Sequence, residues 1–586
     1  MSSLDWTILV ITLVTIVSYG LYKSRTSKNL EGYFLSNRSM PWYLVLLSIM
    51  GTQASAITFL SAPGQAFTDG MRFVQYYFGL PLAMIVICIT FVPLFRKLNV
   101  FTAYEFLEQR FDVKTRTFTS ALFLLSRGLS TGISICAPSI ILSSLMGWDI
   151  FWTNIVMGGL LIIYTVSGGA KAVAYTQQLQ LIIIFSGMFI AGYYIVNYLP
   201  NNINFSEALH LSGATGKLNV ITTGFKDDGS FDLKDKFNII SGTIGGFFLA
   251  LSYFGTDHSQ VGRYLTAKNN TESRLGLLMN GIVKIPMQFL ILMIGALLFV
   301  FYQYQKPPVF FNEVAEEQAY TTAYKPQLEK IKADYNNYQS SLAEYSTKFI
   351  EAERRNDPAA VQLKQQLQQA NAKAQSARKE YVDVMKQAVP GKEKDADYVF
   401  LHFVVDYLPA GLVGLLIAII FLAAWGSIAA ALNSLASCTM IDFYLRFKKH
   451  HAHPEEGDDA ELKKYKLSKW YTFAWGVFCI VVAQFASQLG NSLIEAVNIL
   501  GSLFYGVILG IFIVAFYCKQ VKGNAIFIAA IIGELMVILL FILDHYGIFG
   551  FGFLWLNVAG CIAVVGLGLV LQKFYLPQRH EDTKNH

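Results

Sequence analysis

The sequence predicts an all-α integral membrane protein, and three features of the chain support that fold class. Of its 586 residues, 54% are hydrophobic and 15% are charged, whereas a soluble globular protein has about 25% charged residues. Apolar stretches long enough to cross a bilayer recur along nearly the whole chain. One of them, between Trp42 and Ala62, is interrupted by small and polar residues. Such a break frees backbone groups that lipid cannot satisfy, so it indicates a cavity inside the protein.

Length and apolar composition predict about 13 transmembrane helices. They cover residues 4–22, 41–62, 75–95, 118–146, 150–167, 177–198, 239–258, 275–303, 409–444, 469–488, 492–517, 525–544 and 549–573. Lysine and arginine gather in alternate loops, as they do on the cytoplasmic side of membrane proteins. We therefore expect a multi-pass protein of the cell (inner) membrane, with its N-terminus outside and its C-terminus cytoplasmic. The net charge of +6 comes from those short loops, so the lipid membrane is an expected partner and nucleic acid is not.

A polar segment, residues 305–400, lies on the outer side in this topology. Its composition favours helix from Tyr324 to Val389, and Pro358 disfavours helix at the residue before it. We therefore expect an extracytoplasmic insert built as a hairpin of two helices. Two interpretations of the insert stay open, a solvated surface excursion and a docking site for an extracytoplasmic protein partner.

The remaining helices divide into two units of five. Residues 41–198 form the first unit, and residues 239–304 with 401–517 form the second. Because each unit has an odd number of helices, the second is inverted relative to the first, which is the architecture of many secondary transporters. Residues 1–40 add an N-terminal helix and a cytoplasmic loop, and residues 518–586 add two helices and a cytoplasmic tail.

Each unit is expected to open with an interrupted helix. The first interruption surrounds Gly51, and the second falls at residues 240–247, which include three glycines. Inverted-repeat transporters place their site near the membrane midplane between two such helices. For the second segment, tight helix packing through small residues explains the glycines equally well.

Two basic residues, Arg127 and Lys284, lie well inside predicted spans. A charge at that depth costs at least a few kcal/mol, so it normally faces a cavity or a partner. A cavity-facing or coupling role is one interpretation. The other is a structural ion pair or a carbonyl partner, with Glu534 as an acidic candidate.

The sequence offers no Ser/His/Asp set, phosphate loop or metal cluster, so we expect neither an enzyme nor an ATP-driven pump. His450, His451 and His453 fall in a charged cytoplasmic loop, where solvated side chains are expected. The six cysteines lie in or at the end of apolar runs without metal-ligand spacing. No cofactor is expected apart from a coupling ion.

The ninth predicted helix carries a polar cluster among small residues. Ser427 and Asn433 place hydroxyl and amide oxygens there. Oxygen ligands suit a hard cation such as sodium. Close helix packing is the alternative explanation.

Several ordered motifs occur along the chain, namely Tyr33–Trp42, Ser55–Phe59, Gly168–Val173, Gln260–Leu265, Ala431–Ser434 and Asp442–Tyr444. Together they resemble the sodium/solute symporter family, which includes the sodium/glucose, monocarboxylate and iodide cotransporters. The resemblance runs over residues 4–530 without the insert. It implies a LeuT-like inverted-repeat fold and sodium-driven uptake by alternating access.

The resemblance also implies a sodium site made by backbone oxygens of the first broken helix and by the ninth helix. Its members here are Gly51, Ala54, Ala423 and Ser427. The chain departs from the family at Gly426, where a second serine is usual, and at Gln177, where sodium/glucose relatives have an acid. The serines of a second sodium site fall on Ala429 and Ala430, so the comparison favours one sodium per cycle.

The residues implied for solute binding are Gln53, Thr58, Phe78, Tyr253, Lys284 and Asn498. Tyr253 matches the inner-gate tyrosine of the sugar transporters, and Lys284 matches their cavity lysine. Phe78 replaces a glutamate that accepts hydrogen bonds from sugar hydroxyls in that branch. A small organic anion or a lightly hydroxylated, sugar-like solute therefore fits best.

Sodium-coupled symport of a small solute is the predicted function, with the solute and the sodium ion as partners. One alternative is a sodium-independent uniporter or channel-like transporter. Another is a transporter-like sensor or scaffold that binds a partner through the outer hairpin. Dependence of solute accumulation on a sodium gradient separates the three.

Overall fold

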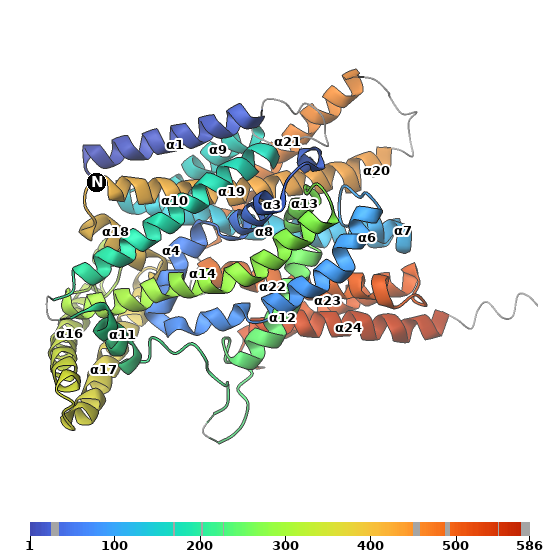
Figure 1. Cartoon of the computed structure of the whole chain (residues 1–586). Helices are drawn as coiled ribbons and strands as arrows, with labels where there is room; N and C mark the ends of the chain where they lie inside the picture. The colour runs from blue at the N-terminus through green and yellow to red at the C-terminus, as the bar shows by residue number, and fades with distance from the viewer. Residues whose placement is uncertain are drawn as a thin grey trace, which may run out of the picture.

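The computed structural model describes residues 1–24, 34–167, 170–200, 203–226, 228–448, 458–486, 493–548 and 550–575. Over these residues the chain is helical apart from loops and two isolated β-bridges. Eight helices in this part are long and apolar enough to cross a membrane, and three shorter apolar helices accompany them. Figure 1 shows the long helices side by side in one bundle, with α16 and α17 at one end and α7 and α20 at the other.

The helices up to residue 214 are α1 (Ser3–Ser24), α3 (Trp42–Gln53), α4 (Ala56–Asp69), α5 (Leu80–Val86), α6 (Val92–Lys97), α7 (Glu105–Arg110), α8 (Val113–Met146), α9 (Ile150–Ser167), α10 (Ala170–Asn197) and α11 (Phe205–Ala214). Short 3₁₀ or π segments join several of them, namely η1 (Ser36–Arg38), η2 (Gly70–Tyr77) and η3 (Ile87–Phe91). The side chain of Asp112 starts α8 by accepting a hydrogen bond from the Thr115 amide at 2.8 Å, a common N-cap.

The later helices are α12 (Gly246–Gly255), α13 (His258–Leu265), α14 (Asn270–Tyr304), α15 (Glu313–Ala319), α16 (Lys325–Arg354), α17 (Ala359–Ala388), α18 (Val399–Tyr407), α19 (Leu412–Cys438), α20 (Leu445–Lys448), α21 (Asp458–Ala483), α22 (Leu493–Tyr517), α23 (Gly523–His545) and α24 (Phe553–Tyr575). The short segments are η4 (Ser241–Gly245), η5 (Ala396–Tyr398) and η6 (Thr439–Tyr444).

Helix α19 lies at the centre of the bundle, and nearly all of its residues from Val413 to Cys438 are buried. A helix that is apolar on all sides is stable only when other helices surround it. Helix α1 covers one side of α19, and Asp5 fixes the contact. The Asp5 carboxylate accepts hydrogen bonds from the amides of Gly411 at 2.6 Å and Gly414 at 3.2 Å. It therefore caps the N-terminus of α19 from another helix.

The first helix break lies where the sequence places it, between α3 and α4. Ala54 has φ −83° and ψ 69°, and Ser55 is extended with ψ 175°. The amides that would continue the α3 hydrogen-bond ladder turn away at this point. The last carbonyls of α3 are therefore available to other partners.

The second break was predicted at residues 240–247, and that prediction is wrong. Those residues form η4, which runs directly into α12, and the chain breaks at Thr256 and Asp257 between α12 and α13. The glycines serve packing instead, because a Cβ atom at Gly242 or Gly246 would collide with the backbone of η2. The small residues bring two helices together and do not interrupt one.

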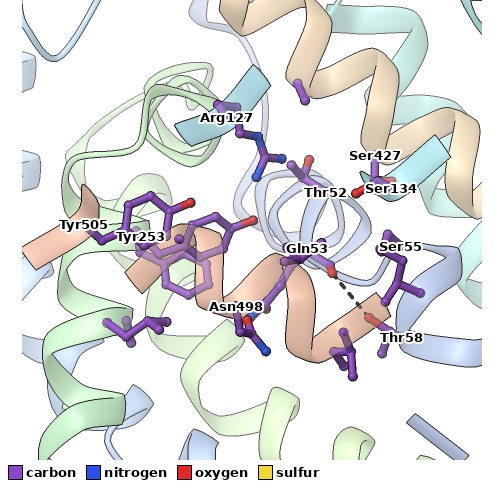
Figure 2. A pocket seen from close by; sticks show the side chains of 18 of the residues that line it. Thr52, Gln53, Ser55, Thr58, Arg127, Ser134, Tyr253, Ser427, Asn498 and Tyr505 are labelled. Atoms are coloured by element: carbon purple, nitrogen blue, oxygen red, sulfur yellow. Dashed lines mark hydrogen bonds between the residues drawn. The ribbon is translucent and has the colours of Figure 1, made fainter. Parts of the chain in front are cut away.

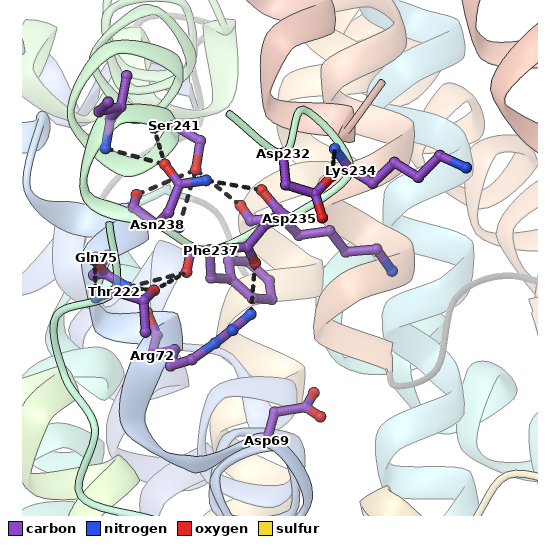
Figure 3. Close-up of polar contacts among 12 residues, drawn as sticks. Asp69, Arg72, Gln75, Thr222, Asp232, Lys234, Asp235, Phe237, Asn238 and Ser241 are labelled. Carbon is purple, nitrogen blue, oxygen red and sulfur yellow. Dashed lines mark hydrogen bonds and ion pairs between the residues drawn. The ribbon is translucent and has the colours of Figure 1, made fainter. Parts of the chain in front are cut away.

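A network of polar contacts holds η2 against the loop that precedes η4 (Figure 3). The Gln75 amide donates to the Phe237 carbonyl at 3.0 Å and to the Thr222 hydroxyl at 3.1 Å. Asn238 accepts the Ser241 amide at 2.9 Å and so caps η4. These hydrogen bonds therefore hold η2 and the loop before η4 together as one packed unit.

The polar segment forms the antiparallel helices α16 and α17, which turn at Asn356 with φ +51°. Arg378 of α17 pairs with the Asp395 carboxylate at 2.7 Å, and its guanidinium lies 5.4 Å from the centre of the Phe67 ring on α4. Arg354 of α16 pairs with Glu207 of α11 at 2.5 Å. The hairpin is thus anchored to the bundle at several points.

Candidate functional site

A pocket lies beside the first break, between α3, α4, η2, α8, α12, α19 and α22 (Figure 2). Its polar lining residues are Thr52, Gln53, Ser55, Thr58, Tyr76, Tyr77, Arg127, Thr131, Ser134, Tyr253, Ser427, Asn498 and Tyr505. Apolar residues of the same elements, together with Leu80 of α5, complete the wall. A cavity with an apolar frame and several convergent polar groups is typical of a small-molecule site.

The four residues implied for sodium lie on the two elements that meet beside this pocket. Gly51 and Ala54 belong to the end of α3 and its break, and Ala423 and Ser427 belong to α19. Ser427 lines the pocket, and its hydroxyl donates to the Ala424 carbonyl at 3.1 Å. Its oxygen lone pairs thus remain able to accept or to coordinate.

Gln177 of α10 connects the two elements. Its Nε2 donates to the Thr52 hydroxyl at 3.3 Å and to the Gly426 carbonyl at 3.4 Å, and its Oε1 accepts from the Ser48 hydroxyl at 3.1 Å. The neutral side chain of Gln177 therefore hydrogen-bonds both α3 and α19. Gln177 is uncharged, and it bridges α3 and α19 through hydrogen bonds alone.

Four of the six residues implied for the solute line the pocket, namely Gln53, Thr58, Tyr253 and Asn498. The Tyr76 hydroxyl donates to Asn498 Oδ1 at 3.0 Å, and Gln260 donates to the Tyr253 hydroxyl at 2.7 Å. Thr58 donates to the Gln53 carbonyl across the break at 3.5 Å. These contacts fix the side chains that face the cavity.

The other two residues, Phe78 and Lys284, are not in the pocket wall. Tyr76 and Tyr77 of η2, which precede Phe78 in the sequence, line the pocket, whereas Phe78 does not. Lys284 is fully buried behind Tyr77, with Nζ 5.4 Å from the centre of that ring. A solute in the pocket as described would meet Tyr77 before it met Lys284.

The charged group that does line the pocket is Arg127 of α8. Among the residues the structure describes, its Nε has no hydrogen-bond partner, and its side chain interacts with the Tyr253 hydroxyl. The neighbouring carboxylate of Asp257 is engaged by the Tyr505 hydroxyl at 2.9 Å and by the Ser259 amide at 2.8 Å. Arg127 thus presents a positive charge to the cavity.

Other lining residues were missed by the sequence analysis, above all Thr131 and Ser134 of α8. With Arg127 they follow a spacing of four and three residues, which places them on one helix face. A polar stripe in an otherwise apolar helix is the signal that would have found them. Tyr505 of α22 carries no comparable signal.

Glu534 is not the counterpart of either buried cation. Both of its carboxylate oxygens are buried without a hydrogen-bond partner within the described ranges. His450, His451 and His453 lie outside the described residues, as do Tyr33, Gly168 and Gly169 of the family motifs. In the part of the chain that the structure describes, no group of His, Cys, Asp and Glu has metal-site geometry.

A helical membrane protein with a central pocket beside broken helices is a secondary transporter by fold and site. The model of the sodium:solute symporter family matches residues 33–322 and 377–533, and the chain belongs to this family. The unmatched residues 323–376 cover α16 and the first part of α17. The chain is therefore a multi-pass sodium-coupled symporter of a small solute.

Relatives and a solved structure agree with this assignment. The sodium/sialic acid symporter SiaT of Proteus mirabilis is 24% identical, over 98% of this chain and 96% of that protein. The sodium-dependent multivitamin transporter of Oryctolagus cuniculus is 24% identical, over 97% of this chain and 72% of that protein. A substrate-bound, outward-open structure of a sodium-coupled sialic acid symporter superposes with a TM-score of 0.70 at 22% identity, covering 98% of both chains. The predicted LeuT-like fold and sodium-coupled symport are thus confirmed.

Proposed function

We propose that this symporter takes up a small hydroxylated organic anion and holds its acid group against Arg127. The observation that carries the proposal is the charge of the pocket. Of the described residues that form the pocket wall, Arg127 is the one with a charged side chain. A desolvated guanidinium binds a carboxylate by two parallel hydrogen bonds.

The rest of the wall supports hydroxyl groups on the solute. Serine, threonine and tyrosine hydroxyls line the cavity around the break, together with the Asn498 amide. Such groups both donate and accept, so they match the hydroxyls of a sugar-like acid. Relatives named for sialic acid include SiaT of Proteus mirabilis and NanT of Aliivibrio fischeri, and an acid sugar meets both requirements.

The proposed sodium site uses the carbonyls of Gly51, Ala54 and Ala423 and the Ser427 hydroxyl. Carbonyl and hydroxyl oxygens suit a hard cation, and the broken end of α3 supplies carbonyls without ladder partners. The residues present therefore fit sodium. A bound ion would screen the free carbonyls and hold α3 against α19.

Alternating access then follows from the two units, which we propose are inverted repeats. In the proposed orientation the N-terminus is outside the inner membrane, and the hairpin of α16 and α17 is extracytoplasmic. Helices α3 and α12 belong to different units, and both border the pocket. Movement of one unit against the other would open the pocket to each side in turn.

Uptake by purified full-length protein in liposomes tests the proposal. A panel of monocarboxylates, sugar acids and the matching neutral sugars is offered with an inward sodium gradient. We expect accumulation of a sugar acid and none of its neutral analogue. Accumulation of neutral sugars alone, or of anions after replacement of Arg127 by glutamine, would overturn it.

A further inference from the structure

Gly426 of α19 faces two glutamines of α10, and one of them fills the space that a side chain at 426 would need. A Cβ atom built on Gly426 would lie 2.8 Å from Oε1 of Gln180 and 3.3 Å from Cγ of Gln177. Real Cβ atoms do not approach an oxygen so closely, so a side chain at 426 and this position of Gln180 exclude each other. The absence of a side chain at Gly426 therefore leaves the space that the Gln180 amide occupies.

Gln180 is buried, with 3% of its surface exposed, and within the described part of the chain its Nε2 has no hydrogen-bond partner. A buried amide whose nitrogen has no partner calls for an explanation, and an ion at the amide oxygen, which would hold the group in this orientation, is one. Its Oε1 is aimed at the segment of α19 that carries Ala423 and Ser427. The amide thus turns its oxygen, not its nitrogen, toward the proposed ion.

Gln177 holds the surrounding frame in place. It contacts Thr52, Ser48 and the Gly426 carbonyl at 3.1–3.4 Å. A Cβ atom at Gly51 would collide with the Gln177 side chain at 2.9 Å. Helix α10 therefore packs directly against both elements of the proposed sodium site.

We propose that Oε1 of Gln180 is a sodium ligand and replaces the oxygen that Gly426 does not supply. Side-chain amide oxygens coordinate hard cations in the same way as backbone carbonyls. Gln177 is a positioning residue that acts through Thr52 and Gly426. This inference rests on the proposed sodium site between α3 and α19.

Sodium-dependent thermal stability of the full-length protein in detergent tests it without transport. Sodium chloride is titrated against choline chloride at constant ionic strength, because an ion that binds only the folded state raises the unfolding temperature. We expect Gln180→Ala to weaken the apparent sodium affinity by about tenfold or more. The matched control is Gln178→Ala, which changes a half-buried glutamine two positions away.

A double variant, Gln180→Ala with Gly426→Ser, tests whether the two positions compensate for each other. Gly426→Ser alone crowds Gln180, whereas Gln180→Ala with Gly426→Ser has both the hydroxyl and the space for it. We expect the double variant to recover most of the sodium affinity that Gln180→Ala loses. Recovery also shows that the loss did not come from misfolding.

The outcomes separate the two levels of the proposal. If sodium leaves the unfolding temperature of the unaltered protein unchanged, the proposed sodium site itself fails. If sodium stabilises the unaltered protein, Gln180→Ala and Gln178→Ala equally, only the assignment of Gln180 fails. The same holds if the double variant is no better than Gln180→Ala.

Discussion

The guanidinium of Arg127 lies with its carbon 5.9 Å from the centre of the Tyr253 ring, and both side chains line the central pocket. They come from two different helices, α8 and α12. A cation beside an aromatic face in a desolvated site is held in place without being neutralised. The pair therefore keeps a positive charge available to a solute.

Replacing Arg127 by glutamine should abolish recognition of the acid group. Loss of one partner of a buried, hydrogen-bonded charge pair costs about 2 kcal/mol or more, which is at least about thirtyfold in Kd. Solute affinity measured by calorimetry or by the thermal shift in saturating sodium checks this.

Lys284→Gln is the comparison for that experiment. Lys284 lies behind Tyr77, so we expect its replacement to change solute affinity much less than replacement of Arg127. The opposite order would mean that Tyr77 moves aside and that Lys284 carries the acid group.

Transport of a monoanion should be electroneutral. Ala429 and Ala430 of α19 are buried and offer no side-chain oxygen, so we expect one sodium ion to accompany each solute. One positive and one negative charge cancel, and the membrane potential then does no work. A second sodium would move one net charge, worth about 2.3 kcal/mol per 100 mV.

Liposomes with a potassium diffusion potential check the charge balance. Uptake driven by a fixed sodium gradient should be the same at zero and at inside-negative potential. Faster uptake at negative potential, with an inward current on a solid-supported membrane, would contradict it. Gln177→Asp with Ala430→Ser, which adds an acid and a hydroxyl, is the variant in which such a current is expected.

The sequence predicted the first break because Gly51, Thr52 and Ser55 interrupt an apolar span. Backbone groups freed by such a break cannot face lipid, so the break must lie inside the protein or line a cavity. The sequence singled out the polar cluster of α19 because polar side chains sit among small residues there, but it did not predict that this helix is central. Both observations depend on local composition, and the structure agrees with the position of the first break.

The second break could not be placed in this way. Glycine permits a break and also permits close packing, and the choice depends on the neighbour that the fold supplies, here η2 against Gly242. The orientation of a buried cation is likewise a tertiary property. Arg127 and Lys284 look alike in sequence, yet one faces the pocket and the other is covered by Tyr77.

Arg378 should be important for the stability of the hairpin end of the bundle. It is buried, pairs with both oxygens of Asp395 at 2.7–2.8 Å, and packs against the rings of Phe67 and Phe311. Removing one partner leaves an unpaired buried charge, so Arg378→Ala should lower the free energy of unfolding by about 3–5 kcal/mol.

Arg354→Ala is the matched control, since its pair with Glu207 lies at the surface and such pairs contribute little. Thermal unfolding in detergent compares the two variants. Equal losses would mean that the hairpin is attached through its surface contacts and not through Arg378.

A pH-dependent contribution to stability is expected from Asp397 of η5. Burial raises the pKa of this carboxyl to about 6, against the smaller opposing effects of the nearby Ser61 hydroxyl and of the hydrogen bond from the Leu493 amide at the start of α22. Because the folded-state pKa lies above the unfolded value of 3.8, the folded protein binds the proton more tightly. The stabilising contribution of the protonated form is therefore complete below pH 4 and is lost as the pH rises through 6.

Asp397→Asn isolates this effect, because its amide oxygen can still accept the Leu493 amide but does not titrate. The free energy of unfolding of the variant relative to the unaltered protein should rise between pH 4 and pH 7, by about 3 kcal/mol at most, and stay level above that. Unfolding temperatures of both proteins from pH 4.5 to 8 provide the measurement. If the difference in stability between the two proteins is constant over this range, or falls with pH, the prediction is wrong. Asp397 would then be a solvated carboxylate with an ordinary pKa.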